Sequence, residues 1–239
     1  MKTSSKKFAA IFLLLAFSLS SCVLLRILKV RDQLKNFNEN FEIKDNEGLE
    51  LVFKKPILSG NDMKWIMKSN PTNIENMQSY DLWTFYLVKR YKKVDQELGD
   101  FDIPLKMKFV NKKLISIIFP KRFLKYFSES TFEKFMSSMG DTEVKKIRKV
   151  ADSSIDTLLD EEIPTTKEIL EVLGIPYKTE FVDEIKTYTY KYRSIKRNDK
   201  GKYLKIKFVM NFDRQSDKLS SLNAVIRGAK INIDFSNFK

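Results

Sequence analysis

Residues 165–176 read TTKEILEVLGIP and residues 187–193 read TYTYKYR, and these two segments decide the fold class. The first combines a Thr-x-x-Glu capping box, an apolar stripe at helical spacing and a Gly-x-Pro ending, which together predict a short amphipathic helix. The second alternates tyrosines with polar residues, which predicts a strand with one buried face. The chain therefore places a short helix before a half-buried strand.

The same order of patterns occurs in the first half of the chain. Residues 59–70, SGNDMKWIMKSN, predict a capped helix, and residues 82–88 predict a strand with Trp83, Phe85 and Leu87 on one side. The matching positions of the two halves lie 105 or 106 residues apart. Agreement of several elements near one offset indicates an internal repeat.

Further strands follow in each half. Residues 105–109, LKMKF, match residues 204–208, LKIKF, at an offset of 99. Residues 113–117 match residues 218–222 at an offset of 105, and residues 230–235 predict a fourth strand in the second half.

Apolar stripes at helical spacing predict additional helices over residues 30–41, 132–139 and 144–158. The expected fold class is α+β, with two tandem units. In each unit, helices precede a three- or four-stranded antiparallel meander and lie on one face of it. The expected boundaries are a signal peptide over residues 1–21, an anchor-proximal helix or linker over 22–44, a first unit over 45–122, and a helical connector plus second unit over 123–239.

The helix over 166–176 followed by the tyrosine-rich strand resembles the BamE/SmpA-OmlA domain. That family carries a T-K-E-x-V-x-x-L-L-G-x-P helix before a strand rich in Trp and Tyr, and the likeness covers roughly residues 160–226. In the first half, Lys68-Ser69-Asn70-Pro71 replaces the Leu-Gly-x-Pro ending. The resemblance implies small envelope lipoproteins with two helices on a three-stranded antiparallel sheet. Two such units in tandem also resemble the β-lactamase-inhibitor protein.

The N-terminus has the pattern of a bacterial export signal. Lysines at positions 2, 6 and 7 precede an apolar run, and the run ends in Leu19-Ser20-Ser21-Cys22. This ending resembles a lipobox, which implies cleavage before Cys22 and attachment of diacylglycerol and an acyl chain such as palmitate to that residue. Cys22 is the only cysteine of the chain. Residues 8–25 are also 18 residues without a charge, so an uncleaved membrane anchor remains an alternative, as does ordinary cleaved secretion.

Composition excludes several kinds of catalytic site. The chain has no His and one Cys, so a Ser/His/Asp triad, a Cys/His pair, a His-ligated metal and an internal disulfide cannot be built from it. Acidic residues gather at positions 95–102 and 160–162, and we interpret them as solvated loop charges without calcium-loop spacing. We expect no enzyme, no cofactor and no metal.

The charge balance of the chain is strongly basic. Lys and Arg number 44 against 31 Asp and Glu, a formal net charge of +13. Strand alternation places six cations on the sheet face opposite the aromatic rows, with no acidic residue between them in these segments: Lys106, Lys108, Lys191, Arg193, Lys205 and Lys207. Such a face is solvated by default or docks an anionic partner.

The sequence thus predicts an exported, lipid-anchored, non-catalytic binding or scaffold protein of the bacterial envelope or periplasm, with a role in envelope or outer-membrane protein assembly. The expected partners are the membrane, through lipidated Cys22, and an envelope protein or anionic headgroups. Export argues against nucleic acid, and no small-molecule substrate is expected. The alternatives are a protein-capturing inhibitor and a carboxylate-based envelope hydrolase.

Overall fold

The computed structural model describes residues 23–90, 99–125, 128–141, 143–145, 150–154, 158–196, 201–226 and 229–235. Residues 23–35 are helical, and the other helices are α2 (Phe37–Asn40), α3 (Gly60–Met67), α4 (Glu129–Gly140) and α5 (Thr166–Leu173), with 3-10 turns η1 (Lys121–Lys125) and η2 (Asp160–Glu162). The strands are β1 (Phe41–Lys44), β2 (Leu49–Phe53), β3 (Asn73–Asn76), β4 (Asp81–Lys89), β5 (Ile103–Val110), β6 (Lys113–Phe119), β7 (Glu143–Lys145), β8 (Val150–Ser154), β9 (Lys178–Val182), β10 (Ile185–Ser194), β11 (Lys205–Asp213), β12 (Leu219–Ile226) and β13 (Ala229–Asp234).

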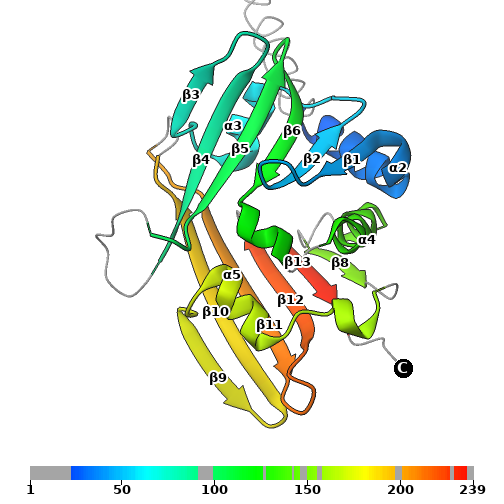
Figure 1. Cartoon of the computed structure of the whole chain (residues 1–239), viewed down its shortest axis with the longest axis vertical. Coiled ribbons are helices and arrows are strands. Elements are labelled where there is room, and N and C mark those ends of the chain that lie inside the picture. Colours follow the sequence, from blue (N-terminus) through cyan, green and yellow to red (C-terminus); the bar gives the residue numbers. More distant parts are fainter. Residues whose placement is uncertain are drawn as a thin grey trace, which may run out of the picture.

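The strands of the described chain form one mixed sheet, and the fold is α+β as the sequence predicts. The strand order is β1-β2-β6-β5-β4-β10-β11-β12-β13-β8-β7, with β3 also on β4 and β9 also on β10. All pairs are antiparallel except the parallel pair of β13 and β8. The expectation of small meanders of three or four strands is wrong, because the described sheet has thirteen strands and continues through the middle of the molecule (Figure 1).

The sheet is continuous because the C-terminal ends of β4 and β10 pair with each other. Lys89 lies opposite Tyr192, and Leu87 lies opposite Ser194. The N-terminal part of β4 pairs with β3, and the N-terminal part of β10 pairs with β9. Each of these long strands therefore belongs to its own hairpin and also to the junction between the two halves of the sheet.

Helices α3 and α5 begin in the same way. The side chain of Ser59 accepts a hydrogen bond from the backbone of Asp62, and the Asp62 carboxylate accepts one in return from the Ser59 backbone. Thr165 and Glu168 form the same capping box at the start of α5. Each box satisfies backbone N–H groups that have no partner within the helix. Both expected capping boxes are confirmed.

The residues that cap these helices also contact the third strand of the same half. Ser59 forms an isolated bridge with Lys113, and Thr165 forms one with Lys218. The Leu114 N–H donates to the carbonyl of Leu58 at 2.9 Å, which ties the chain before α3 to β6.

The second strands of the two halves correspond differently from the sequence expectation. Met107 lies opposite Trp83 in the first half, and Met210 lies opposite Tyr188 in the second. The pairing therefore gives an offset of 103, and the expected offset of 99 is wrong. Because these offsets differ by an even number, both alignments place the same side chains on the buried face.

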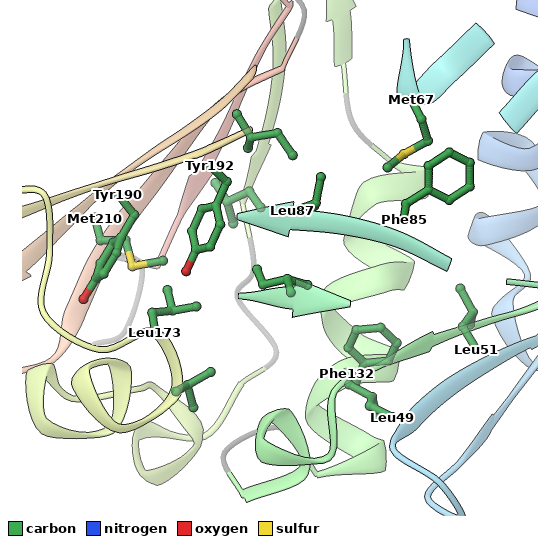
Figure 2. Packing of buried hydrophobic residues seen from close by; sticks show 14 of the residues in the cluster. Leu49, Leu51, Met67, Phe85, Leu87, Phe132, Leu173, Tyr190, Tyr192 and Met210 are labelled. Carbon is green, nitrogen blue, oxygen red and sulfur yellow. The ribbon is translucent and has the colours of Figure 1, made fainter. Parts of the chain in front are cut away.

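The aromatic rows face the core, as expected. Phe85 and Leu87 are buried, and so are Tyr188, Tyr190 and Tyr192. Trp83 is partly buried, and the centre of its ring lies 4.5 Å from that of Phe109. Figure 2 shows that Tyr190, Tyr192 and Leu173 of the second half and Phe85, Leu51 and Met67 of the first half belong to the same hydrophobic cluster. The two halves of the sheet share this core.

The expected helix over residues 144–158 is wrong. Residues 143–145 and 150–154 are the strands β7 and β8, and β8 pairs in parallel with β13 at the end of the sheet. The apolar spacing fits a helix, but pairing with β13 satisfies the backbone of this segment and extends the sheet. Tertiary pairing here overrides the local pattern. In contrast, the expected helix over 132–139 is confirmed as part of α4.

The segment expected to be an anchor-proximal helix or linker is part of the globular fold. Residues 23–35 are helical, Leu34 and Phe37 are buried in the core, and Phe41 begins β1. The expected signal peptide and Cys22 lie outside the described residues. Among the helices that the structure describes, none is both long and apolar enough to span a membrane.

Candidate functional site

Four of the six predicted cations lie together on the outer face of β10 and β11. Lys191 lies opposite Lys207, and Arg193 lies opposite Lys205. Residues opposite each other on neighbouring strands are roughly 5 Å apart, and residues two apart on one strand are roughly 7 Å apart. These four side chains therefore mark the corners of a small positively charged rectangle. Their strand neighbours Tyr190, Tyr192 and Ile206 are buried on the other face, as predicted.

The other two predicted cations are not part of this cluster. Lys108 lies 3.2 Å from the carboxylate of Glu50, which belongs to β2 and so lies outside the segments that carry the predicted cations. Lys106 pairs with Thr84 and Ile118 in the first half. Glu50 was not foreseen beside Lys108 because β2 was not predicted from the sequence.

A groove of about 420 Å³ lies over the cation cluster. Besides Lys191, Lys205 and Lys207, its wall contains three cations that the sequence did not single out, namely Lys68, Arg90 and Lys202. The described residues that line the groove include no acidic side chain; the remainder are Tyr192, Tyr203, Leu204, Ile206 and Val225. We refer to this site as the basic groove.

The added cations come from the ends of elements that meet only in the folded chain. Lys68 ends α3 with a left-handed backbone at φ 42°, and Arg90 directly follows β4. The Arg90 N–H donates to the Lys191 carbonyl at 2.7 Å, which extends the β4–β10 junction by one bond. The junction that joins the two halves of the sheet thus also brings Arg90 to the cations of β10.

Tyrosine rings stabilise two of the clustered charges. The Lys191 ammonium lies 3.6 Å from the centre of the Tyr177 ring, and the Arg193 guanidinium lies 5.0 Å from that of Tyr203. A cation over an aromatic face gains about 0.5–1 kcal/mol at an exposed site. Like charges directly opposite each other on a sheet are destabilising, so these rings offset part of the repulsion and hold the cations in place without neutralising them.

A second ionic cluster lies on the buried face at the same junction. Lys89 is only 4% exposed, and its ammonium donates to the Leu173 carbonyl at the end of α5. It also lies 5.1 Å from the ring centre of Phe101. Burial lowers the pKa of Lys89 from 10.5 to about 8, while the nearby Asp102 carboxylate opposes that shift.

Arg122 completes this cluster. Its guanidinium donates to the carbonyls of Val172 at 2.9 Å and Asp102 at 2.7 Å. Burial lowers the pKa of Arg122, and electrostatic interactions with Tyr192 and the Asp102 carboxylate oppose that effect. Because Lys89 and Arg122 belong to the first half and α5 to the second, their bonds to the last α5 carbonyls connect the two halves. We assign this cluster a structural role.

Asp102 and Glu162, one from each acidic cluster of the sequence, accept hydrogen bonds from donors within the fold. The Asp102 carboxylate accepts the N–H groups of Lys89 at 2.6 Å and Gly99 at 2.8 Å. Glu162 accepts from the Lys134 ammonium at 2.8 Å and from a backbone N–H. Asp95 and Glu97 lie outside the described residues. No cluster of His, Cys, Asp and Glu suited to a metal occurs among the residues described.

Comparison with known protein families, with curated proteins and with solved structures found no match for this chain.

The basic groove can bind an anion through several cations at once. Tyr203 and Val225 are among its uncharged lining residues, and its cations come from both strands and from the ends of α3 and β4. Binding of this kind is electrostatic and weakens as salt screens the charges.

Proposed function

We propose that this protein is an exported, lipid-anchored and non-catalytic binding protein of the bacterial envelope, whose basic groove holds an acidic segment of another envelope protein. The observation that carries the proposal is the groove itself, where six cations from four parts of the chain surround one hollow. A solvated surface does not require cations to converge in this way.

The proposed architecture is two tandem copies of a BamE-like unit. The matched capping boxes of α3 and α5 support it, as do the bridges from each cap to the third strand of its half. The hairpins also correspond: the Thr72 N–H donates to the Thr84 carbonyl at 2.7 Å, and the Tyr177 N–H donates to the Thr189 carbonyl at 2.8 Å. Both donor and acceptor are shifted by 105 residues between the halves. Such a unit does not by itself define a function.

An acidic protein segment fits the groove better than an isolated carboxylate does. An extended peptide presents alternate side chains roughly 7 Å apart on one side, which is the spacing of the cations along β10 and β11. Aspartates or glutamates at every second position would therefore meet Lys191 and Arg193, or Lys205 and Lys207, in succession.

In-cell crosslinking tests this proposal. Wild-type protein and the double variant Lys205→Glu, Lys207→Glu are crosslinked in the native envelope, and captured proteins are identified. The matched control is Lys121→Glu, Lys167→Glu, which makes the same charge change at two exposed lysines outside the groove. We expect a protein captured by the wild type and the control but lost from the groove variant. Its acidic segment should bind in solution with an affinity that falls as salt rises.

Two results would contradict the proposed partner. Capture that survives charge reversal in the groove shows that the groove does not bind the partner. Binding of the wild type to vesicles with anionic headgroups, without any protein captured through the groove, assigns the groove to the lipid surface.

The proposed anchor has a separate test. A metabolic fatty-acid probe should label the wild type and leave Cys22→Ala unlabelled. Equal labelling of both proteins contradicts lipidation at Cys22. Persistence of residues 1–21 in the mature protein would support the membrane-helix alternative.

A further inference from the structure

The start of the described chain is fixed to the globular fold. The Arg26 guanidinium lies 2.6 Å from the Asp62 carboxylate, which is buried at the beginning of α3. Further along the same helical segment, Leu34 is buried, and Phe37 follows it into the core. From residue 23 onward, therefore, the described chain has no free linker between its start and the sheet.

Two leucines are exposed directly before this ion pair. Leu24 is 52% exposed and Leu25 is 56% exposed, although each is a large apolar side chain. Isolated exposed leucines are ordinary. These two are adjacent in sequence, and Arg26 holds them beside the N-terminus of α3.

Lysines lie next to the same end of α3. The Gly60 N–H contacts the Lys112 carbonyl at 3.4 Å, and Ser59 forms a bridge with Lys113. Both lysines are exposed and lie at the turn between β5 and β6. The start of α3 therefore connects a pair of exposed leucines to a pair of exposed lysines.

Another exposed apolar side chain belongs to the same end of the molecule. Met77, in the turn between β3 and β4, is 47% exposed. Figure 1 places the β3–β4 and β5–β6 turns together at one end and the β9–β10 and β11–β12 turns at the opposite end. We call this end the anchor-proximal surface, defined by Leu24, Leu25, Met77, Lys112 and Lys113.

We infer that the anchor-proximal surface lies against the lipid bilayer and fixes the orientation of the whole molecule. This inference rests on the proposed membrane anchoring, and it applies whether the anchor is lipidated Cys22 or an uncleaved helix over residues 8–25. Either anchor leaves the bilayer next to Leu24, and the Arg26–Asp62 pair leaves little freedom beyond it. Apolar side chains enter the boundary between headgroups and acyl chains, while nearby lysines contact anionic headgroups.

Depth-dependent quenching tests this orientation. Single cysteines are introduced by Met77→Cys and by Lys113→Cys at the anchor-proximal surface, and by Gln215→Cys at the opposite end as the matched control. The anchored full-length proteins are placed in vesicles of phosphatidylcholine and phosphatidylglycerol, labelled with a fluorescent maleimide, and quenched by lipids brominated near the headgroup. The wild type, whose only cysteine is Cys22, measures background labelling.

We expect a loss of fluorescence at positions 77 and 113 and none at position 215, because interfacial segments enter the bilayer by roughly 5–10 Å. The change Leu24→Ser, Leu25→Ser should reduce the loss at position 77 while fatty-acid labelling of Cys22 continues. Equal quenching at all three positions, or none at any, overturns the orientation even if Cys22 is labelled, so the proposed anchor survives that result. Absence of the protein from membranes overturns both the orientation and the proposed anchor.

Discussion

Replacing Lys89 by methionine tests whether one buried ammonium group makes the stability of the protein depend on pH. Methionine has nearly the same length and shape, so the hydrophobic packing around Phe101 and Tyr190 is largely retained. The change removes the charge and the hydrogen bond to the Leu173 carbonyl. The Asp102 carboxylate keeps its two backbone donors, because these come from the main chain of Lys89 and Gly99.

The expected magnitude follows from the lowered pKa. Burial lowers the pKa of Lys89 to about 8 in the folded protein, against 10.5 in the unfolded chain. Between these values the unfolded chain binds the proton and the folded protein does not, so stability must rise with pH. Keeping the ammonium protonated in the fold costs about 3 kcal/mol at neutral pH. Between pH 7 and 9.5, about 2 kcal/mol of that cost should be relieved.

Denaturant unfolding followed by tryptophan fluorescence measures this effect. The free energy of unfolding is determined for the wild type, for Lys89→Met and for Lys121→Met, the latter changing an exposed lysine. Subtracting the variant curve from the wild-type curve cancels the titration of groups common to both. Between pH 7 and 9.5, the free energy of unfolding of the wild type should rise by about 2 kcal/mol relative to that of Lys89→Met. The free energy of unfolding of Lys121→Met should change with pH as that of the wild type does. Parallel curves for the wild type and Lys89→Met would refute a lowered pKa at this position.

Other substitutions test local features of the fold. Gly174→Ala should lower the free energy of unfolding by about 3 kcal/mol, since the backbone has φ +66° and an added Cβ would lie 2.6 Å from the Phe101 ring; a loss below that of an ordinary surface change would contradict the expected strain. Burial raises the pKa of Asp62, but hydrogen bonds from Arg26 and Ser59 outweigh it and hold the pKa below its usual value. Asp62→Asn should therefore lower the free energy of unfolding by about 1–2 kcal/mol at neutral pH. This difference from the wild type, measured by denaturant unfolding, should shrink in acid as the wild-type Asp62 carboxylate becomes protonated. A fragment of residues 121–239 should fail to unfold cooperatively, because both halves contribute to one core; a sharp calorimetric transition of this fragment would show independent folding.

Local patterns predicted the elements whose signals are complete within a few residues. The capping boxes of Ser59 and Thr165 determine where α3 and α5 begin, and the alternation of Tyr188 and Tyr190 determines which face of β10 is buried. Strand β8 is different, since its sequence also fits a helix stripe and only its partner β13 makes it a strand. Strands β3 and β9 are exposed along their whole length, so they carry no buried alternation to detect.

The candidate site shows why the face of a residue is easier to predict than its neighbours. Period-two alternation places Lys106, Lys108, Lys205 and Lys207 on the face away from the aromatic rows. The offset between the second strands of the two halves was expected to be 99 and is 103, and this error of four residues leaves the predicted face unchanged because four is even. The same error moves a residue about 13 Å along a strand. Pairing puts Met107, between the first two lysines, opposite Trp83, whereas Lys205 and Lys207 flank Ile206 opposite Tyr192 at the junction.

The junction therefore decides which cations act together. Where β4 and β10 meet, Arg90 joins Lys191 through a backbone bond, and Lys68 enters from the end of α3. No spacing in the sequence relates these residues, because Arg90 and Lys68 each lie just beyond the end of their own element, while Lys191 lies within β10. In the first half, Lys108 forms an ion pair with Glu50 instead of joining a cluster of cations. A charge pattern shared by two halves of a chain thus gives one groove, located where the fold joins those halves.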